Sequence, residues 1–280
     1  MNDSGDPPGG PPAATPADAP AGDLGPEQLP EKVAELAGEI SEARSQSRVR
    51  RLALGIPELA GRGQRSARTG LRYGRTRLQY GWTGLRSGGQ WLATQVLAMA
   101  PRLPVRDADT LRAQFPGHTP EEVADALIEG ASRATAGVGL AVGASMVLPV
   151  GPSAPVEIGV QTLAVVGIEL KLVAELHEVY GMRAPGTRAD RMMAYVDAWA
   201  HRRGIGLDPG GLILAAGSPL RRQLERRLIA QSGRSASSLG PLLTGAAAAA
   251  LLNRQETRKL GRQIRDDLRH RSPDPATWPG

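Results

Sequence analysis

The chain has no cysteine, and aromatic residues make up only 3% of its 280 residues, with Phe115 as the single phenylalanine. The absence of cysteine excludes disulfide bonds, thiolate nucleophiles and cysteine-ligated metal sites. Because large aromatic side chains are scarce, any core must be built from Leu, Val, Ile and Ala. At this length the chain can bury a sizeable core in one or two domains.

Recognisable catalytic motifs are also missing. Neither a GxxxxGK[ST] phosphate loop nor a GxSxG nucleophile elbow occurs, and Ser145 lies in an apolar run without a base nearby. His177 has no second histidine one helical turn away, and the pair Asp197 and His201 supplies only two ligands, so neither predicts a zinc site. We therefore predict a protein that is not an enzyme, with no catalytic residue, no cofactor, no metal and no evident small-molecule substrate.

The two ends of the chain lack the composition of folded segments. Residues 1–28 are mostly Pro, Ala, Gly and Asp, which cannot bury enough apolar surface to offset the entropy of ordering. We predict a disordered tail there and a second one at residues 272–280. The start MNDSGDPPGG is neither basic nor apolar, so it does not resemble a secretory signal, and we expect a cytoplasmic protein.

The charge of the chain is unevenly distributed. Its net charge is +6, but residues 1–43 hold nine acids against Lys32, and residues 44–106 hold thirteen arginines against Glu58. A concentrated basic segment is expected where a protein meets a polyanionic surface. We divide the folded part into residues 29–106, with an acidic helix followed by this Arg-rich segment, and residues 107–271.

A heptad repeat lies within the Arg-rich segment. Leucine recurs every seven residues at positions 71, 78, 85 and 92, and a glycine follows the first three of them by three residues: Gly74, Gly81 and Gly88. This spacing predicts a single stripe along one helix. Glycine in a helix costs about 1 kcal/mol relative to alanine. A close approach should compensate for that cost, either by a partner helix or by a lipid surface.

Basic and aromatic side chains surround this stripe. They are Arg65, Arg68, Arg72, Arg75, Arg77, Arg86, Trp82 and Trp91. A basic helix with interfacial aromatics fits docking on an anionic bilayer. Two alternatives remain: a helix of a soluble bundle whose arginine face is solvated, and nucleic-acid binding through the same arginines.

Helix signals predominate after residue 106, and alternating strand patterns are absent, so we predict an all-α fold. Helix starts are indicated by a capping box at Thr119–Glu122, by Pro155 and by Thr187 with Asp190. Two further starts are expected at residues 208 and 218, and a last helix over residues 238–270. Around residue 171 we expect the pair of Lys171 and Glu175 to be an ordinary surface contact.

An apolar, glycine-dotted stretch over residues 134–173 predicts a helical hairpin with a turn near residue 150. The first arm is too short for a simple membrane span, and the second contains Glu157, Glu169 and Lys171, so two full spans are not expected. Gly139 and Gly143 form a GxxxG motif that permits close helix packing. A buried core and a shallow contact with a membrane both remain open.

The run GVGLAVG, followed by LPVGPSAPVE and a helix that closes on KLVAELHEVYG, resembles the central signature of the EcsC family. The segment PLLTGAAAAALLNRQETRKLG, with Asn253 and Thr257, resembles the closing segment of that family. The resemblance covers about residues 119–265. Glu157 departs from it, because the family often has Asp there. The resemblance implies a bacterial, membrane-linked protein and supplies no catalytic residues.

Together these patterns give three functional hypotheses. The first is a non-enzymatic helical protein that docks peripherally at the inner face of the cell membrane through its Arg-rich helix. The second is a soluble interaction module that binds a partner helix, or a second copy of itself, through the Gly/Leu stripe. The third, nucleic-acid binding, ranks last.

Overall fold

The computed structural model describes residues 27–59, 91–145, 154–203, 240–272 and 278, and these ranges are helical with no strand. The all-α prediction is therefore confirmed for this part of the chain. The predicted tails lie outside the described residues except for residues 27, 28, 272 and 278. The same holds for the heptad repeat up to residue 90 and for the helix starts expected at residues 208 and 218.

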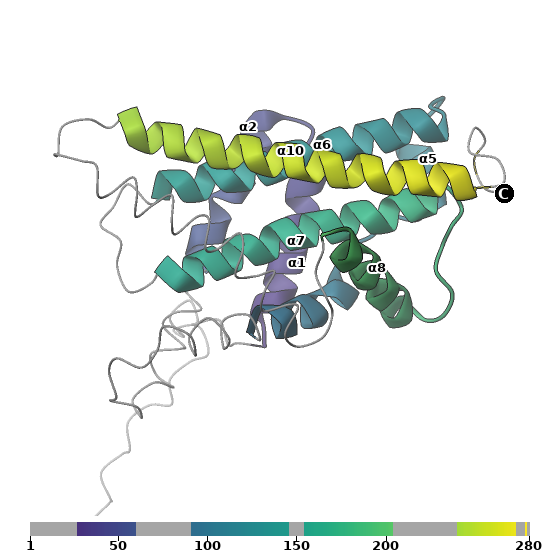
Figure 1. The fold of residues 1–280 in the computed structure, drawn as a ribbon, viewed down its shortest axis with the longest axis horizontal. Helices are drawn as coiled ribbons and strands as arrows, with labels where there is room; N and C mark the ends of the chain where they lie inside the picture. Colours follow the sequence, from purple (N-terminus) through teal and green to yellow (C-terminus); the bar gives the residue numbers. More distant parts are fainter. Residues whose placement is uncertain (1–26, 60–90, 146–153, 204–239, 273–277, 279–280) are drawn as a thin grey trace, which may run out of the picture.

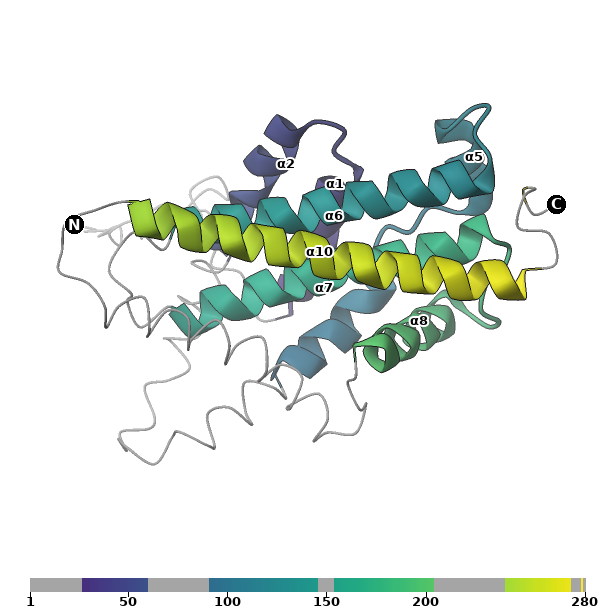
Figure 2. The same ribbon diagram turned by 45° about the horizontal axis from the view of Figure 1, so that its top comes forward.

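Three long helices lie side by side along the molecule (Figures 1 and 2): α6 (Pro120–Ser145), α7 (Ala154–Val179) and α10 (Gly240–Arg271). Helix α6 runs antiparallel to the other two. The hairpin predicted from the apolar stretch corresponds to α6 and α7, and the last helix begins and ends close to the predicted limits.

Helices α6 and α10 pack closely along a seam that has two parts. At Gly139 an added β-carbon would lie 3.1 Å from the Cα atom of Ala250, so the backbones nearly touch. Further along, opposite charges face each other, as in the pair of Asp125 and Arg265 at 2.5 Å. Such partly exposed pairs contribute about 0–1 kcal/mol each, but like-charge contacts in another register would be unfavourable.

Helix α7 is the most enclosed of the three. From Val160 to Tyr180 almost every residue is buried, including Leu163, Ile168 and Leu176. Its apolar residues occur all round the helix, which is typical of a helix with neighbours on every side. Those neighbours are α6 and α10, α1 (Leu29–Glu42), which crosses the bundle, and α8 (Arg188–Arg202).

Shorter elements complete the described fold. Helix α2 (Gln46–Ala53) packs on α6. The elements η2 (Ala100–Arg102) and α5 (Ala108–Gln114) lie between α2 and α6 in the sequence. A single hydrophobic core includes Ile40, Met99 and Leu163. Residues on both sides of the boundary predicted at residue 106 thus share this core.

The predicted helix starts depend on side-chain caps. Thr119 Oγ1 accepts from the Glu122 amide at 3.3 Å, and the Glu122 carboxylate accepts from the Thr119 amide at 2.8 Å. Thr187 and Asp190 make the same reciprocal pair at the start of α8. Both capping boxes are confirmed, and each satisfies amides that the first helical turn leaves unpaired.

The lengths and polarities of the described helices bear on membrane topology. None of the helices in the described ranges combines the length and the apolarity that crossing a bilayer requires.

Candidate functional site

Lys171 and Glu175 are buried at the centre of an ion cluster, so the prediction of a surface contact is wrong. Their side chains are only 1% and 3% exposed, and Lys171 Nζ lies 2.6 Å from Glu175 Oε1. Lys171 also lies 2.9 Å from Glu42 of α1 and donates to the carbonyl of Pro104. The i,i+4 spacing predicts the pair correctly, but the burial comes from partners distant in sequence.

Arg106 completes this cluster from the segment between η2 and α5. Its Nε and Nη2 atoms donate to the two carboxylate oxygens of Glu175 at 2.8 and 2.7 Å, a bidentate arrangement. Its Nη1 atom donates to Gln114 at 2.8 Å. Two cations and two carboxylates therefore meet here, and the cluster ties α1, α5 and α7 together.

The electrostatics of the cluster follow from its pairing. Burial alone would raise the pKa of the Glu175 carboxyl, but hydrogen bonds from Arg106 and the positive charge of Lys171 outweigh burial, so this pKa is lowered. Burial alone would lower the pKa of the Arg106 guanidinium, but the hydrogen bond to Glu175 and the charge of Glu175 outweigh burial, so this pKa is raised. Each of the four charges in the cluster therefore has an oppositely charged partner.

A second buried carboxylate, Glu169, lies where α7 meets α8 and α10. Trp199 Nε1 donates to it at 2.8 Å and Thr257 Oγ1 donates to it at 2.8 Å, while Arg203 pairs with it from beyond the end of α8. The Thr257 hydroxyl lies 3.0 Å from that of Thr135 on α6. We call Glu169, Thr257 and Thr135 the polar layer, since one level of all three long helices contributes to it.

Charge on the three long helices lies almost entirely on one side of the polar layer. On the other side the stretches 134–145 of α6, 158–168 of α7 and 240–253 of α10 contain no charged residue. Glu157, in the first turn of α7, is the exception. We call these three stretches the uncharged half of the bundle. It lies at the left in Figures 1 and 2, where α6 ends and where α7 and α10 begin.

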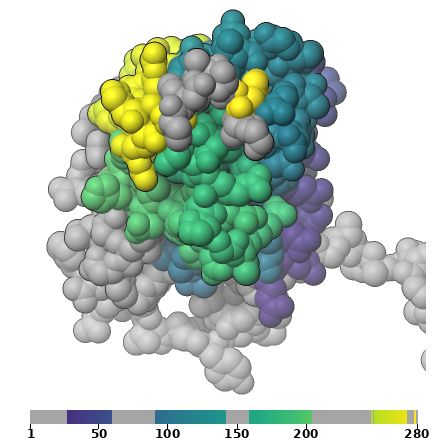
Figure 3. All heavy atoms as spheres, turned by 90° about the vertical axis from the view of Figure 1, so that its right-hand side faces the viewer, coloured from purple at the N-terminus to yellow at the C-terminus, as the bar shows by residue number. Residues whose placement is uncertain are grey.

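The opposite, charged half is seen end-on in Figure 3. There the green residues of α7 and α8 fill the centre, between the yellow end of α10 and the blue-green start of α6. Glu121 belongs to this half: it accepts a hydrogen bond from Tyr180 at 2.9 Å and lies 3.6 Å from Arg269. The pKa of the Tyr180 phenol is raised by burial and by this hydrogen bond.

Basic residues lie beside the uncharged half. Helix α2 packs on it through Val49, which occupies the space that a β-carbon on Gly137 would need. Helix α2 also exposes Arg48, Arg50 and Arg51, and none of these arginines forms an ion pair with a carboxylate of the described residues. Cationic side chains thus lie beside the uncharged half at α2, while α1, which meets this half at Gly167, exposes Glu31, Glu35 and Glu39.

The described part of the chain contains three of the predicted site residues. Trp91 packs on α7, where a β-carbon on Gly159 would lie 2.8 Å from its ring. Gly139 packs against α10 as the GxxxG motif predicts, and Gly143 lies one turn further along α6. The remaining predicted residues lie outside the described ranges: Arg65, Arg68, Arg72, Arg75, Arg77, Arg86, Trp82, Gly74, Gly81 and Gly88.

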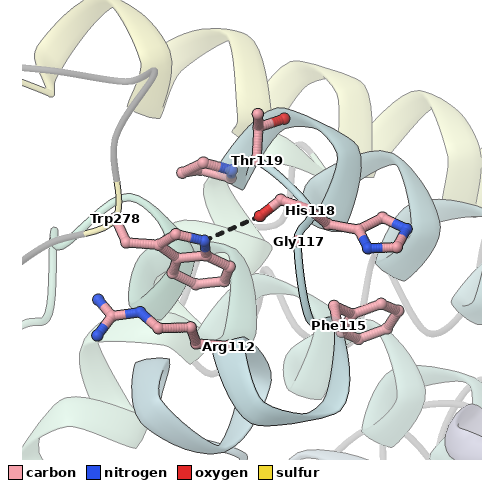
Figure 4. A pocket seen from close by; sticks show the side chains of 7 residues that line it. Arg112, Phe115, Gly117, His118, Thr119 and Trp278 are labelled. Atoms are coloured by element: carbon pink, nitrogen blue, oxygen red, sulfur yellow. Dashed lines mark hydrogen bonds between the residues drawn. The ribbon is translucent and has the colours of Figure 1, made fainter.

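A shallow pocket lies at the turn between α5 and α6, and the indole of Trp278 forms part of its lining (Figure 4). Trp278 Nε1 donates to the carbonyl of His118 at 3.0 Å, and the guanidinium of Arg112 lies 5.5 Å from the ring centroid. The sequence analysis does not predict this contact, although Trp278 is a large apolar residue in a segment of mostly Pro, Ala and Gly, which is a signal for packing.

Neither a metal site in the described ranges nor a similar known protein indicates a function. Within the described ranges, no three His, Asp or Glu side chains are grouped so that they could hold a metal ion. No protein-family model, no curated protein and no solved structure matches the chain. The EcsC resemblance over residues 119–265 therefore stays a prediction.

Proposed function

We propose that this protein is a non-enzymatic, peripheral membrane protein that docks on anionic lipid at the inner face of the cell membrane. The observation that carries the proposal is the distribution of charge along the bundle. Apart from Glu157, charged residues on α6, α7 and α10 stop at one level, and the exposed arginines of α2 lie beside the half beyond it. An apolar surface with a cationic border is the arrangement expected of a protein that settles on an anionic bilayer.

The Arg-rich segment adds to this argument through its point of attachment. Trp91, the last of the predicted lipid-contacting residues, packs on Gly159 within the uncharged half. The arginines at positions 65–86 therefore precede a residue that is fixed to this half of the bundle. Near an anionic surface each engaged arginine contributes about 1 kcal/mol, so four of them suffice to hold the protein there.

Flotation with vesicles tests the proposal directly. The full chain should float with vesicles that contain anionic lipid and should stay at the bottom of the gradient with neutral vesicles. Replacing Arg68, Arg72, Arg75 and Arg77 by Glu should abolish flotation, while helix content, measured by circular dichroism, stays unchanged. Wild-type protein that fails to float with anionic vesicles would show that the proposal is wrong.

The same preparation separates the other hypotheses. A partner-helix module should lose binding to its partner on Gly81→Leu without losing lipid binding. A nucleic-acid-binding protein should shift duplex DNA in a gel with strong salt dependence, which the charge-reversed variant should lose.

A further inference from the structure

The exposed stripe of α10 changes chemistry along its length. In the charged half the exposed positions are polar or charged, including Gln255, Lys259 and Arg262. On the N-terminal side of Asn253 the helix exposes Ala247 and Leu251, and Leu251 is 59% exposed. Leu252 beside it is 37% exposed. Exposed leucines that continue a polar stripe are unexpected for a face that meets water alone.

The change falls at the polar layer. Thr257 lies one turn from Asn253, whose side chain donates to the carbonyl of Thr135 at 3.3 Å. Glu169, which of the buried α7 carboxylates in the described residues lies nearest the uncharged half, is bound at the same level. Apart from Glu157, the three long helices thus become uncharged at one common level, and the boundary is not confined to α10.

We propose that the exposed residues Ala247, Leu251 and Leu252 of α10 form the surface that enters the lipid, and that the charged residues from Arg254 onward stay in the headgroup region or in water. This inference rests on the proposed membrane docking and names the surface that makes it. The stretch 240–253 is about 20 Å long at 1.5 Å per residue, too short to cross a hydrocarbon core of about 30 Å. Shallow insertion of a helix flank fits this length.

A lipid surface fits this face better than a second copy of the chain does. Its described members are Ala247, Ala249, Leu251 and Leu252, and alanines offer little area. A stable dimer needs about 800 Å² and some 20 residues on each side. The net charge of +6 further favours an anionic bilayer over a second copy of this basic chain.

Because the chain has no cysteine, single dye-labelled positions can test this surface without background. We would label Leu251→Cys with the fluorophore NBD and compare it with Gln263→Cys, an exposed position on the charged half of the same helix. With anionic vesicles, the dye at position 251 should shift to the blue, brighten severalfold and be quenched by shallow doxyl lipids. The dye at position 263 should not respond.

Each other outcome overturns a defined part of the inference. If the labelled protein floats with the vesicles and position 251 does not respond, the docking holds and this surface is wrong. Failure to float refutes the proposed function itself. A response at both positions means that the charged half also enters the lipid. A concentration-dependent blue shift at position 251 without vesicles assigns the surface to a second copy.

A charge variant gives an independent measure. Replacing Leu251 and Leu252 by Glu should weaken partitioning to anionic vesicles at least about tenfold, because carboxylates at this depth are costly. The matched variant, with Gln255 and Gln263 replaced by Glu, carries the same added charge on the polar stripe. An equal loss in both variants would reduce the effect to net charge and overturn the inference.

Discussion

Lys171 Nζ lies 2.6 Å from Glu175 Oε1, one turn apart on α7, and both side chains are shielded from solvent. Two charges can be buried together only if each is paired and hydrogen-bonded, and here Arg106 and Glu42 supply the remaining partners. The arrangement joins the first helix of the described chain to its most enclosed helix. Substitutions that remove one partner of this cluster should therefore lower the stability of the protein by a large and measurable amount.

Glu175→Gln should lower the free energy of unfolding by about 3–5 kcal/mol, because it leaves Lys171 and Arg106 with only Glu42 to compensate them. Urea unfolding measures the change. Glu35→Gln is the matched control, since Glu35 is an exposed carboxylate on α1, and it should leave stability nearly unchanged. Equal midpoints for the two variants would contradict a structural role for the cluster.

Thr257→Val should lower stability by about 1–3 kcal/mol, because it removes a donor from the buried Glu169 without changing the shape of the side chain. Trp199→Phe removes a second donor to the same carboxylate and should act in the same direction. Combined in one protein, the two changes should be non-additive, since they share a partner. Strict additivity in a double-mutant cycle would argue against a shared layer.

Two glycines of α6 should respond in opposite ways to alanine. Gly139→Ala places a methyl group 3.1 Å from the backbone of Ala250 and should destabilise the protein by about 1–3 kcal/mol. At Gly130 the added group meets only the Ser41 carbonyl at 3.6 Å, so Gly130→Ala should gain up to about 1 kcal/mol of helix propensity. Thermal unfolding would show the two signs directly.

His177 should make stability depend on pH near neutrality. Burial lowers the pKa of its imidazole below the ordinary 6.5, against smaller opposing contributions that include Asp267 and Glu178, while Arg271 adds to the lowering. Its ring packs 4.7 Å from that of Tyr195. Because the folded state disfavours the proton, the stabilisation is complete above about pH 6.5 and is lost as the pH falls through the folded-state pKa.

Urea unfolding between about pH 7.5 and pH 5.5 measures this dependence, which cannot exceed about 1.4 kcal/mol per pH unit for one proton. His177→Gln should remove it and leave the acid-side loss caused by the carboxylates. Glu175 is one of these, since its lowered pKa places its loss of stabilisation below about pH 4.5. A wild-type slope that survives in the glutamine variant would assign the dependence to other groups.

Trp278→Ala should release the chain end from the turn between α5 and α6, at a cost of about 1–2 kcal/mol for its hydrogen bond and its contact with Arg112. Trp278→Phe keeps a ring over Arg112 but loses the donor to His118. Its stability should therefore lie between the stabilities of the wild type and of Trp278→Ala. Limited proteolysis of the chain end gives a second readout. Equal cleavage of all three proteins would contradict the docked position.

Local signals were sufficient to predict the long helices. Thr119 and Thr187 cap their helices through residues three positions away, so the information lies within one turn of sequence. The same locality explains the error at Lys171: spacing identifies Glu175 as a partner but says nothing about burial, which depends on Glu42 and Arg106, more than sixty residues upstream. The donors to Glu169 likewise come from helices brought together only by folding.

The position of α10 at the end of the described chain has a consequence for folding during synthesis. Helix α10 supplies Thr257 to Glu169 and covers one side of both α6 and α7, yet it is the last described helix to be synthesised. A nascent chain that has reached residue 203 therefore presents the uncovered flanks of two apolar helices to the cell. Since contacts of such long sequence separation form late, the native core closes only after nearly all of α10 has left the ribosome.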